Sequence, residues 1–343
     1  MDHLWPEPVV RVQAISEAGT PVIPERYVKP PSERPSPDTP VPHLSIPVID
    51  LGAPVGGAQA IPVACREWGF FQIVNHGVSL ELVRRVRDVW RDFFHLPIEA
   101  KEAYGNSPVT YEGYGSRVGV EKGAVLDWGD YYFLHLMPES SKWPMQSTYC
   151  REVTVEYGIE VMKLCKVLLR VLSSLGLGME EDFMEKAFGG EEMGCCLRVN
   201  YYPKCPQPEL TLGLSAHSDP GGLTVLLPDE RVNGLQVKKG DVWVNVDPLP
   251  NAFVINVGDQ IQVLSNGTFK SVEHRVVANA AEERLSLALF CNPRTDLLLG
   301  PAMELVTPER PLLYQSMTFS EYRMYIRKNG PKGKAQVESL KAV

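Results

Sequence analysis

The chain lacks the cysteine spacing that would hold a disulfide framework or a zinc site. Its 7 cysteines among 343 residues are odd in number and scattered, and no two of them form a Cys-x-x-Cys pair. Small disulfide-rich folds and cysteine-ligated zinc sites both depend on paired spacing. We therefore expect reduced thiols, and with them a reducing compartment, at Cys65, Cys150, Cys165, Cys195, Cys196, Cys205 and Cys291.

Long apolar runs and an excess of positive charge are also missing. No segment reaches 18 apolar residues without a charge, and residues 1–8 show no basic segment followed by an apolar one. We therefore expect neither a membrane span nor a secretory signal. The expected location is the cytoplasm, with the nucleus as a second compartment. The formal net charge of −8 disfavours binding to nucleic acid or to anionic membranes, because an acidic surface repels both. The expected partner is a small molecule, and the sequence does not define an oligomeric state.

The composition, 44% hydrophobic and 22% charged, is typical of a globular protein. Residues 29–42 are rich in proline and should run extended over the surface. We divide the chain into an N-terminal segment with this linker (1–43), a helical domain (44–190), a strand-rich domain (191–300) and a C-terminal helical segment (301–343).

The domain over 44–190 shows helical patterns and two short strands. Residues 46–51 and 70–74 are predicted strands, and Ser79 caps a predicted helix that continues to Phe94. From Thr148 to about Gly176, apolar residues at helical spacing predict a long amphipathic helix with a solvated basic stripe. The apolar positions are Val161, Leu164, Leu168, Val171, Leu172 and Leu175, and the basic ones are Lys163, Lys166 and Arg170.

After Cys195 the pattern changes to short β-type runs separated by turn residues. Eight strands are predicted, at 197–202, 223–227, 235–237, 242–246, 252–256, 261–264, 272–277 and 285–292. Short strands at regular spacing are typical of a jelly roll. The predicted fold is therefore mixed α and β, with a double-stranded β-helix (jelly roll) core, a helical N-terminal part and a C-terminal helix.

His217, Asp219 and His274 form the most informative pattern in the chain. Two imidazoles and one carboxylate are the ligand set that holds a non-haem Fe(II) on one face and leaves the other positions open. His217 and Asp219 are two residues apart, so both side chains point the same way on an extended segment, and we expect His274 on a facing strand. Each histidine alone could be an ordinary core residue, and the combination favours a metal site. The remaining histidines are predicted to be structural: His3, His43, His76, His95 and His135.

Arg284 and Ser286 are the next pair, two residues apart on a predicted strand. A hairpin through 279–283 would bring them into the same cavity as His274. An arginine with a nearby hydroxyl is suited to bidentate binding of a carboxylate. The alternative is an ion pair of Arg284 with Glu282, Glu283 or another internal acid.

Arg198, Asn200 and Tyr202 fall on one face of the strand that we place across the barrel. Asn200 and Tyr202 can hydrogen-bond an iron-chelating 2-oxo acid. Arg198 then remains free for a different anion.

The chain resembles plant 2-oxoglutarate and Fe(II)-dependent dioxygenases over nearly its whole length. The resemblance rests on residues 46–51, 65–77, 200–203, 214–222 and 284–286. It implies a jelly roll with a helical N-terminal part, O₂ and 2-oxoglutarate as cosubstrates, and ascorbate as a supporting reductant. The implied site residues are His217, Asp219 and His274 on Fe(II), Arg284 and Ser286 on the distal carboxylate of 2-oxoglutarate, and Asn200 and Tyr202 on its other end.

The two ends of the chain resemble a narrower group, the jasmonate-induced oxygenases. The matching segments are residues 5–13, 318–327 and 330–334. This resemblance implies hydroxylation of jasmonic acid to 12-hydroxyjasmonic acid, which would lower active jasmonate and down-regulate jasmonate signalling and plant defence. It also implies a C-terminal segment that covers the substrate pocket, and substrate contacts at Arg198, Phe319, Arg323 and Arg327.

The residues of the C-terminal segment agree with such a pocket. Thr318 and Glu321 have the spacing of a capping box, and Gly330 can end the helix. Arg323 and Arg327 lie on one helix face, where two like charges repel each other unless an anion lies between them. The alternative is an exposed basic helix end, stabilised by the helix dipole.

Three function classes remain open from the sequence. The first is a jasmonate-type hydroxylase. The second is a flavonoid-type oxidase of the same family, whose uncharged aromatic substrate would leave Arg323 and Arg327 without an anion. The third is a catalytically silent binder of a carboxylate hormone, against which the intact His217, Asp219 and His274 pattern argues.

Overall fold

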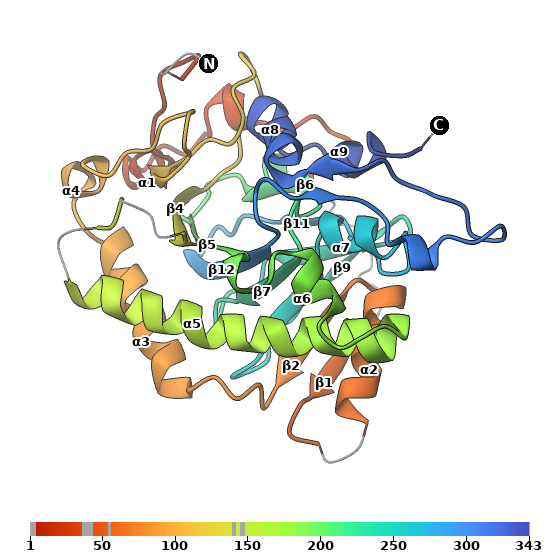
Figure 1. The fold of residues 1–343 in the computed structure, drawn as a ribbon. Helices are drawn as coiled ribbons and strands as arrows, with labels where there is room; N and C mark the ends of the chain where they lie inside the picture. Colours follow the sequence, from red (N-terminus) through yellow and green to blue (C-terminus); the bar gives the residue numbers. More distant parts are fainter. Residues whose placement is uncertain (1–4, 36–43, 54–55, 139–141, 145–147, 343) are drawn as a thin grey trace.

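The structure, a computed structural model, describes residues 5–35, 44–53, 56–138, 142–144 and 148–342. Two sheets form its centre, as the sequence predicted for a jelly roll (Figure 1). The large sheet has the order β1 (Val48–Asp50), β2 (Phe70–Val74), β10 (Phe253–Val257), β7 (Leu223–Leu227), β12 (Arg284–Asn292), β5 (Gly194–Tyr202), β4 (Asp130–Met137) and β3 (Gly113–Gly115). The small sheet has the order β6 (Leu214–His217), β11 (His274–Val276), β8 (Leu235–Lys239) and β9 (Val242–Asn245).

Neighbouring strands in both sheets are antiparallel, except that β1 and β2 are parallel. Along β12 the side chains alternate between two environments. Leu285, Leu287 and Leu289 belong to the main hydrophobic core, whereas Ser286 and Ala288 line a cavity on the other face. This alternation follows from the two-residue repeat of a strand, and it gives the large sheet one apolar face and one functional face.

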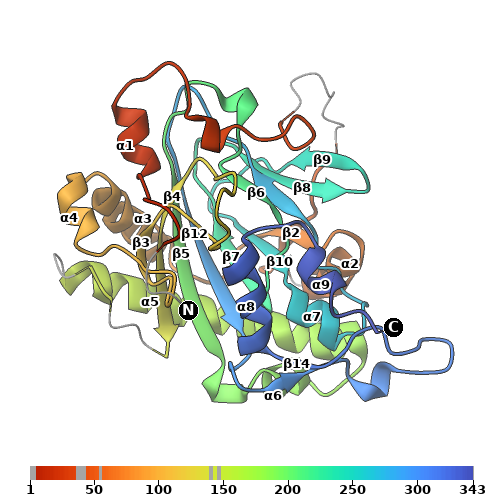
Figure 2. The same cartoon turned by 90° about the horizontal axis from the view of Figure 1, so that it is seen from above.

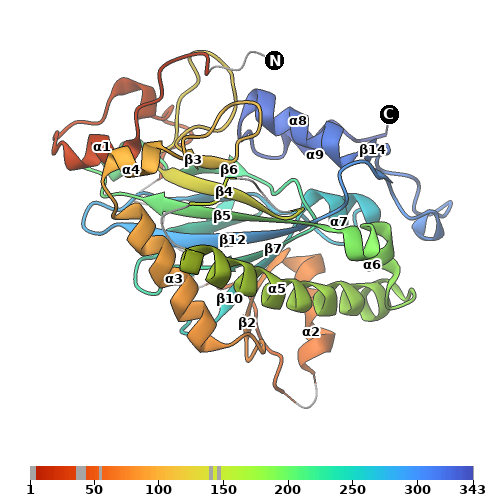
Figure 3. The ribbon, with the colours of Figure 1, turned by 60° about the vertical axis from the view of Figure 1, so that its left-hand side comes forward.

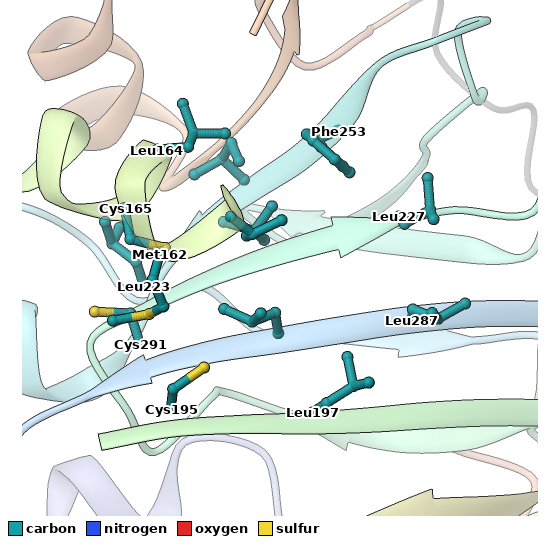
Figure 4. Packing of buried hydrophobic residues seen from close by; sticks show 14 of the residues in the cluster. Met162, Leu164, Cys165, Cys195, Leu197, Leu223, Leu227, Phe253, Leu287 and Cys291 are labelled. Carbon is teal, nitrogen blue, oxygen red and sulfur yellow. The ribbon is translucent and has the colours of Figure 1, made fainter. Parts of the chain in front are cut away.

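Helices cover the apolar face of the large sheet. They are α2 (Gly57–Glu67), α3 (Leu80–Phe94), α5 (Thr148–Val171) and α6 (Phe183–Ala187). Figure 3 shows α5 running along the sheet with α3 beside it. Figure 4 shows Leu164 and Cys165 of α5 above Leu223, Leu287 and Cys291 of the strands.

The C-terminal helices lie on the opposite side of the large sheet from α5. These are α8 (Phe319–Asn329) and the short α9 (Ala335–Glu338), preceded by the two-stranded pair β13 (Leu298–Leu299) and β14 (Met317–Thr318). Figures 2 and 3 both place α8 over the face of β12 and β7 that is not covered by α5. The remaining short helices are α1 (Val12–Glu17), η1 (Glu25–Tyr27), α4 (Ile98–Glu102), η3 (Gly190–Glu192), η4 (Pro208–Leu210) and η5 (Met303–Leu305).

Several local predictions are confirmed. α3 begins after Ser79, whose hydroxyl accepts a hydrogen bond from the Leu82 amide at 3.4 Å, and it ends at Phe94. All seven cysteines are free and buried. Within the described ranges, no helix is both long and apolar enough to cross a membrane. His3, His43 and residues 36–42 of the predicted linker lie outside the described residues.

The strand predicted at 261–264 is wrong, because this segment is the helix α7 (Asp259–Leu264). Every residue of α7 is buried, so its short apolar run carries no periodicity that distinguishes a helix from a strand. Strands β3, β4, β6, β13 and β14 were not among the predicted strands, although the segment around His217 was expected to be extended.

The long helix was predicted correctly up to Val171, and its last part was not. Residues Leu172–Gly176 form a π-helical turn, whose wider repeat shifts the side-chain register, so that Leu175 is 52% exposed. The basic stripe is paired rather than merely solvated. Lys166 contacts Glu185 at 3.3 Å and Glu191 at 2.8 Å, and Arg170 contacts Glu185 at 3.4 Å.

Two predicted strand relationships are also wrong. Residues 279–283 do not form a hairpin, because β11 pairs with β6 and β8 in the small sheet whereas β12 pairs with β5 and β7 in the large sheet. The segment between them crosses from one sheet to the other. β5 is the immediate neighbour of β12 and does not lie across the barrel from it.

The packing of β12 generates a stability prediction. Leu287 is fully buried, so Leu287→Ala should lower the free energy of unfolding by about 2–5 kcal/mol through lost burial and a residual cavity. The matched control is Leu298→Ala, since Leu298 is 71% exposed and its truncation should change stability by no more than about 0.5 kcal/mol. Urea unfolding measures both, and equal effects of the two substitutions would contradict this packing.

Candidate active site

A cavity of about 200 Å³ lies between the functional face of the large sheet, the small sheet and α8. All eleven site residues proposed from the sequence line it. They are Arg198, Asn200, Tyr202, His217, Asp219, His274, Arg284, Ser286, Phe319, Arg323 and Arg327.

His217, Asp219 and His274 meet at one end of the cavity. One ligand atom from each residue lies within 4.8 Å of the other two. His217 ends β6 and is the direct cross-strand partner of His274 at the start of β11, so the two histidines come from adjacent strands of one sheet and not from facing strands. The Nε2 atom of each histidine lies 3.6 Å from Oδ1 of Asp219.

Hydrogen bonds fix the orientation of these three side chains. Nδ1–H of His217 donates to the carbonyl oxygen of Ser215 at 2.8 Å, and Nδ1–H of His274 donates to that of Val272 at 3.2 Å. Nε2 of each ring is therefore left as the unprotonated atom that faces the centre of the group. These backbone contacts are the outer contacts that orient a metal ligand.

Asp219 is oriented in the same way through its second oxygen. Oδ2 accepts hydrogen bonds from the hydroxyl of Thr224 at 2.5 Å and from the amide of Asn256 at 2.8 Å. Both donors project from the large sheet, on β7 and β10. Oδ1 is thus left to face the two histidines.

The ionisation of His274 and Asp219 also suits a divalent metal ion. Burial, followed by the charge of the neighbouring His217, lowers the pKa of His274 to about 4, so this imidazole is neutral at neutral pH. Burial opposes ionisation of Asp219, but His274, His217 and the amide of Asn256 hold its pKa well below the usual range. Two imidazoles and one carboxylate form the donor set that Fe(II) accepts in non-haem oxygenases.

Arg284, which the sequence resemblance implies as a contact of 2-oxoglutarate, is the first residue of β12. It is 3% exposed, and its Nη1 donates to the Ser286 hydroxyl at 3.2 Å. Its Nε has no hydrogen-bond partner, and no ion pair to it occurs among the described residues. The alternative partner Glu283 instead accepts from the Tyr201 hydroxyl at 2.6 Å and contacts His95 at 2.7 Å. A buried guanidinium with unused donors indicates an anion-binding site.

The strand register places the other anion-binding candidates beside this arginine. Tyr202 is the cross-strand neighbour of Arg284, and Asn200 is that of Ser286. The guanidinium of Arg284 lies 5.4 Å from the ring centroid of Tyr202. Arg198, two residues further along β5, lies 4.2 Å from the ring centroid of Tyr131, and its Nε is also buried without a partner.

Helix α8 closes the cavity with the third group of residues. Its predicted capping box is present, with Thr318 and Glu321 hydrogen-bonded reciprocally, and Gly330 follows its last residue with a φ of 72°. Phe319 is 1% exposed, and Arg323 lies 5.6 Å from the centroid of its ring. The predicted alternative, an exposed basic helix end, is not what the structure shows.

Arg327 has aromatic and backbone neighbours, and no carboxylate of the described residues forms an ion pair with it. It lies 5.5 Å from the ring centroid of Tyr111, and its guanidinium reaches the carbonyl oxygens of Val109 and Thr110 at 3.4 and 3.5 Å. Burial lowers the pKa of Arg327, and the nearby positive charge of Arg323 lowers it further. In the part of the chain that the structure describes, Arg198, Arg323 and Arg327 form no ion pair.

Other residues of the cavity were missed from the sequence. The two outer hydrogen-bond donors, Thr224 and Asn256, have no local signal, because only the pairing of β7 with β10 brings them to Asp219. The remaining missed residues are mainly apolar, and the aromatic ones among them are Phe70, Tyr111, Tyr131, Phe133 and Phe290. The alternation of Tyr131 and Phe133 along β4 could have identified two of them as one face of a strand.

Sequence comparisons identify the relatives of this chain. The sequence pattern of the 2OG-Fe(II) oxygenase superfamily matches residues 193–293, and the N-terminal pattern of the non-haem dioxygenase in morphine synthesis matches residues 46–153. The chain is 56% identical to jasmonate-induced oxygenase 2 of Arabidopsis thaliana, over 98% of this chain and 94% of that protein. It is 39% identical to flavonol synthase 1 of Crocosmia x crocosmiiflora, over 92% of this chain and 97% of that protein.

A solved structure is similar to nearly the whole chain. It is the crystal structure of JOX2 in complex with 2OG, Fe and JA. The TM-score is 0.94 at 56% sequence identity, with 99% of this chain and 100% of that chain covered.

The geometry of the metal end generates a prediction about metal affinity. Thr224→Val removes one of the two hydrogen bonds that orient Asp219 and should weaken Fe(II) or Co(II) binding by about tenfold or more. His274→Ala, which removes a ligand, should abolish binding. The control Thr268→Val removes a hydroxyl that donates to the backbone of Ser265 at 2.7 Å, away from the site, and should leave affinity unchanged. Isothermal titration calorimetry with the metal ion measures these affinities. Normal affinity of the His274→Ala variant would exclude the proposed ligand set.

Proposed function

Because the chain belongs to the 2OG-Fe(II) oxygenase superfamily, it is an Fe(II)- and 2-oxoglutarate-dependent dioxygenase, and we propose that it hydroxylates jasmonic acid to 12-hydroxyjasmonic acid. The observation that carries the choice of substrate is the group of unpaired guanidinium groups, Arg198, Arg323 and Arg327, in the same cavity as the metal residues. The similarity to a protein crystallised with 2OG, Fe and JA supports it. The reaction would remove active hormone and so reduce jasmonate signalling and defence.

His217, Asp219 and His274 are proposed to hold Fe(II), which supplies the activation of O₂ when it is bound. The chain contributes the geometry of this step. Ser215, Val272, Thr224 and Asn256 hold the ligand atoms in place, so little reorganisation is needed when the metal binds.

Arg284 and Ser286 are proposed to bind the distal carboxylate of 2-oxoglutarate. Asn200 and Tyr202, their cross-strand neighbours, would bind its other end. This arrangement uses the free donors of Arg284, and it points the 2-oxo acid from the large sheet toward the metal residues on the small sheet.

The substrate carboxylate is proposed to lie between Arg198 on β5 and the two arginines of α8. Its negative charge would relieve the repulsion between Arg323 and Arg327, which are one helical turn apart. Phe319 would cover the apolar body of the substrate. We also propose that the segment 301–343 acts as the cover of the pocket, since α8 supplies these three residues.

A flavonoid-type oxidase is the second candidate, and the identity to flavonol synthase 1 favours it only at the level of the family. An uncharged flavonoid would leave three guanidinium groups without an anion.

We further propose a cytoplasmic location, with the nucleus as a second compartment. The seven free cysteines are consistent with a reducing compartment.

The proposed cosubstrate site predicts a loss of affinity. Arg284→Ala should weaken 2-oxoglutarate binding by about tenfold or more, because a hydrogen bond to a charged group contributes about 1.5–3 kcal/mol. Binding is measured by calorimetry under anaerobic conditions with Mn(II) in place of iron. An unchanged affinity for 2-oxoglutarate would show that Arg284 binds a different acid.

The proposed carboxylate clamp predicts discrimination between jasmonic acid and its methyl ester. The ester has no negative charge, so it should be a poor substrate of the unaltered enzyme, and Arg323→Ala should reduce kcat/KM for the free acid by about tenfold or more. Lys328→Ala is the matched control, because Lys328 is an exposed cation on the same helix and does not line the cavity. Equal turnover of acid and ester by the unaltered enzyme would argue for a neutral substrate.

A further inference from the structure

The hydroxyl of Tyr322 connects α8 to the centre of the protein. Tyr322 is 2% exposed and lies next to Arg323, but it faces away from the cavity. Its hydroxyl donates to Oδ2 of Asp259 at 2.7 Å. Burial raises the pKa of Tyr322, and the adjacent Asp259 raises it further, so the hydroxyl remains a donor at neutral pH.

Asp259 extends this connection to the segment that carries the metal residues. The same Oδ2 accepts a hydrogen bond from the hydroxyl of Ser218 at 3.2 Å, and Ser218 stands between His217 and Asp219 in the chain. The backbone amide of Asp259 donates to the carbonyl oxygen of Asp219 at 2.8 Å. One fully buried carboxylate, at the start of α7, therefore contacts both α8 and the metal-binding segment.

The chain just after α8 makes a second connection to the same segment. The amide of Gly333 donates to the carbonyl oxygen of Ala216 at 2.8 Å, and the amide of Ser218 donates to that of Gly333 at 3.3 Å. Gly333 has a φ of 55°, and a Cβ there would lie 2.5 Å from Glu273 Oε1, so a larger residue is disfavoured. Helix α8 is thus tied to the residues around His217 through a side-chain network and through the backbone.

These contacts connect the carboxylate-binding residues of α8 with the metal-binding segment, and the reaction requires a fixed distance between the two. A substrate held at its carboxylate by α8 presents one carbon atom to the metal residues, and a displacement of α8 changes which carbon that is. Errors of about 1 Å in such positioning can reduce rates by about 100-fold. Tyr322 directly precedes Arg323 on α8, and Arg327 follows about one turn later, so its hydrogen bond anchors the start of the part of the helix that carries the clamp.

We propose that Tyr322 and Asp259 are positioning residues that fix the distance between the carboxylate clamp on α8 and the metal-binding segment, and thereby select the carbon that is hydroxylated. This inference rests on the proposed function, since it takes α8 to hold the substrate. Neither residue lines the cavity, and their effect is exerted through Arg323, Ser218 and Asp219.

The test is Tyr322→Phe in the full-length enzyme loaded with Fe(II) and 2-oxoglutarate. The amount of 2-oxoglutarate consumed per hydroxylated jasmonate should rise by about threefold or more, and hydroxylation at neighbouring carbons should appear, because the substrate is less well placed. This ratio does not depend on how much of the protein is active. A purely structural role would leave the ratio and the site of hydroxylation unchanged, and that result would overturn the proposal.

Two further variants control this test. Tyr314→Phe removes a similarly buried hydroxyl, which accepts from Gln262 Nε2 at 3.0 Å in the same C-terminal cluster without contact to Ser218 or Asp219. It should leave the ratio unchanged. Asp259→Asn keeps an oxygen acceptor for Tyr322 and should stay close to the unaltered enzyme. A rise of the ratio in Tyr314→Phe equal to that in Tyr322→Phe would contradict the specific network.

Hydrogen exchange of the metal-free protein provides a readout that does not require turnover. Tyr322→Phe should accelerate exchange of the α8 amides, whereas Tyr314→Phe should not. If the unaltered enzyme fails to oxidise jasmonic acid, the proposed function is wrong, and unchanged exchange in Tyr322→Phe would separately reject the anchoring of α8.

Discussion

A group of four arginines without ion pairs, one buried and three half-buried, is the feature on which the rest of this structure depends. Arg198, Arg284, Arg323 and Arg327 face one cavity, and none of them forms an ion pair in the described ranges. Desolvating a charge without a partner is costly, and the cost is offset when anions bind. Two anionic molecules match this arrangement. A 2-oxo acid would bind at Arg284, and an organic acid substrate would bind at Arg198, Arg323 and Arg327.

The two sheets separate the tasks of the site. The small sheet carries both histidines on adjacent strands, and the large sheet carries Arg284 with its neighbours and the two residues that orient Asp219. The core between the large sheet and α5 consists of buried apolar residues, so the face that lines the cavity rests on a well-packed support. Among the described residues, α8 is the one helix that lines the site. Its connections to the metal-binding segment, through Asp259 and through Gly333, therefore matter for the position of the substrate relative to the metal.

Much of this arrangement could be predicted from the sequence, because the relevant patterns are local. The two-residue spacing of His217 and Asp219, the same spacing of Arg284 and Ser286, and the helical spacing of Phe319, Arg323 and Arg327 each place side chains on one face without knowledge of the fold. The capping residues Ser79 and Thr318 also act locally. These are the features that the structure shows where they were expected.

The features that could not be predicted depend on strand pairing. The sequence does not show that β5 lies beside β12, that β11 and β12 belong to different sheets, or that Thr224 and Asn256 reach Asp219. The helix α7 was read as a strand because its uniform burial removes any periodicity. The same pairing information is needed to find Asp259, whose role depends on contacts with residues that are distant in the chain.

The most direct measurement for the central claim is the fate of labelled dioxygen. The purified protein is supplied with Fe(II), 2-oxoglutarate and jasmonic acid under ¹⁸O₂, and the products are analysed by mass spectrometry. The account predicts one labelled oxygen in a hydroxylated jasmonate and one in succinate, formed in equal amounts. Consumption of 2-oxoglutarate with no labelled jasmonate, while a flavonoid in the same assay becomes hydroxylated, would contradict it.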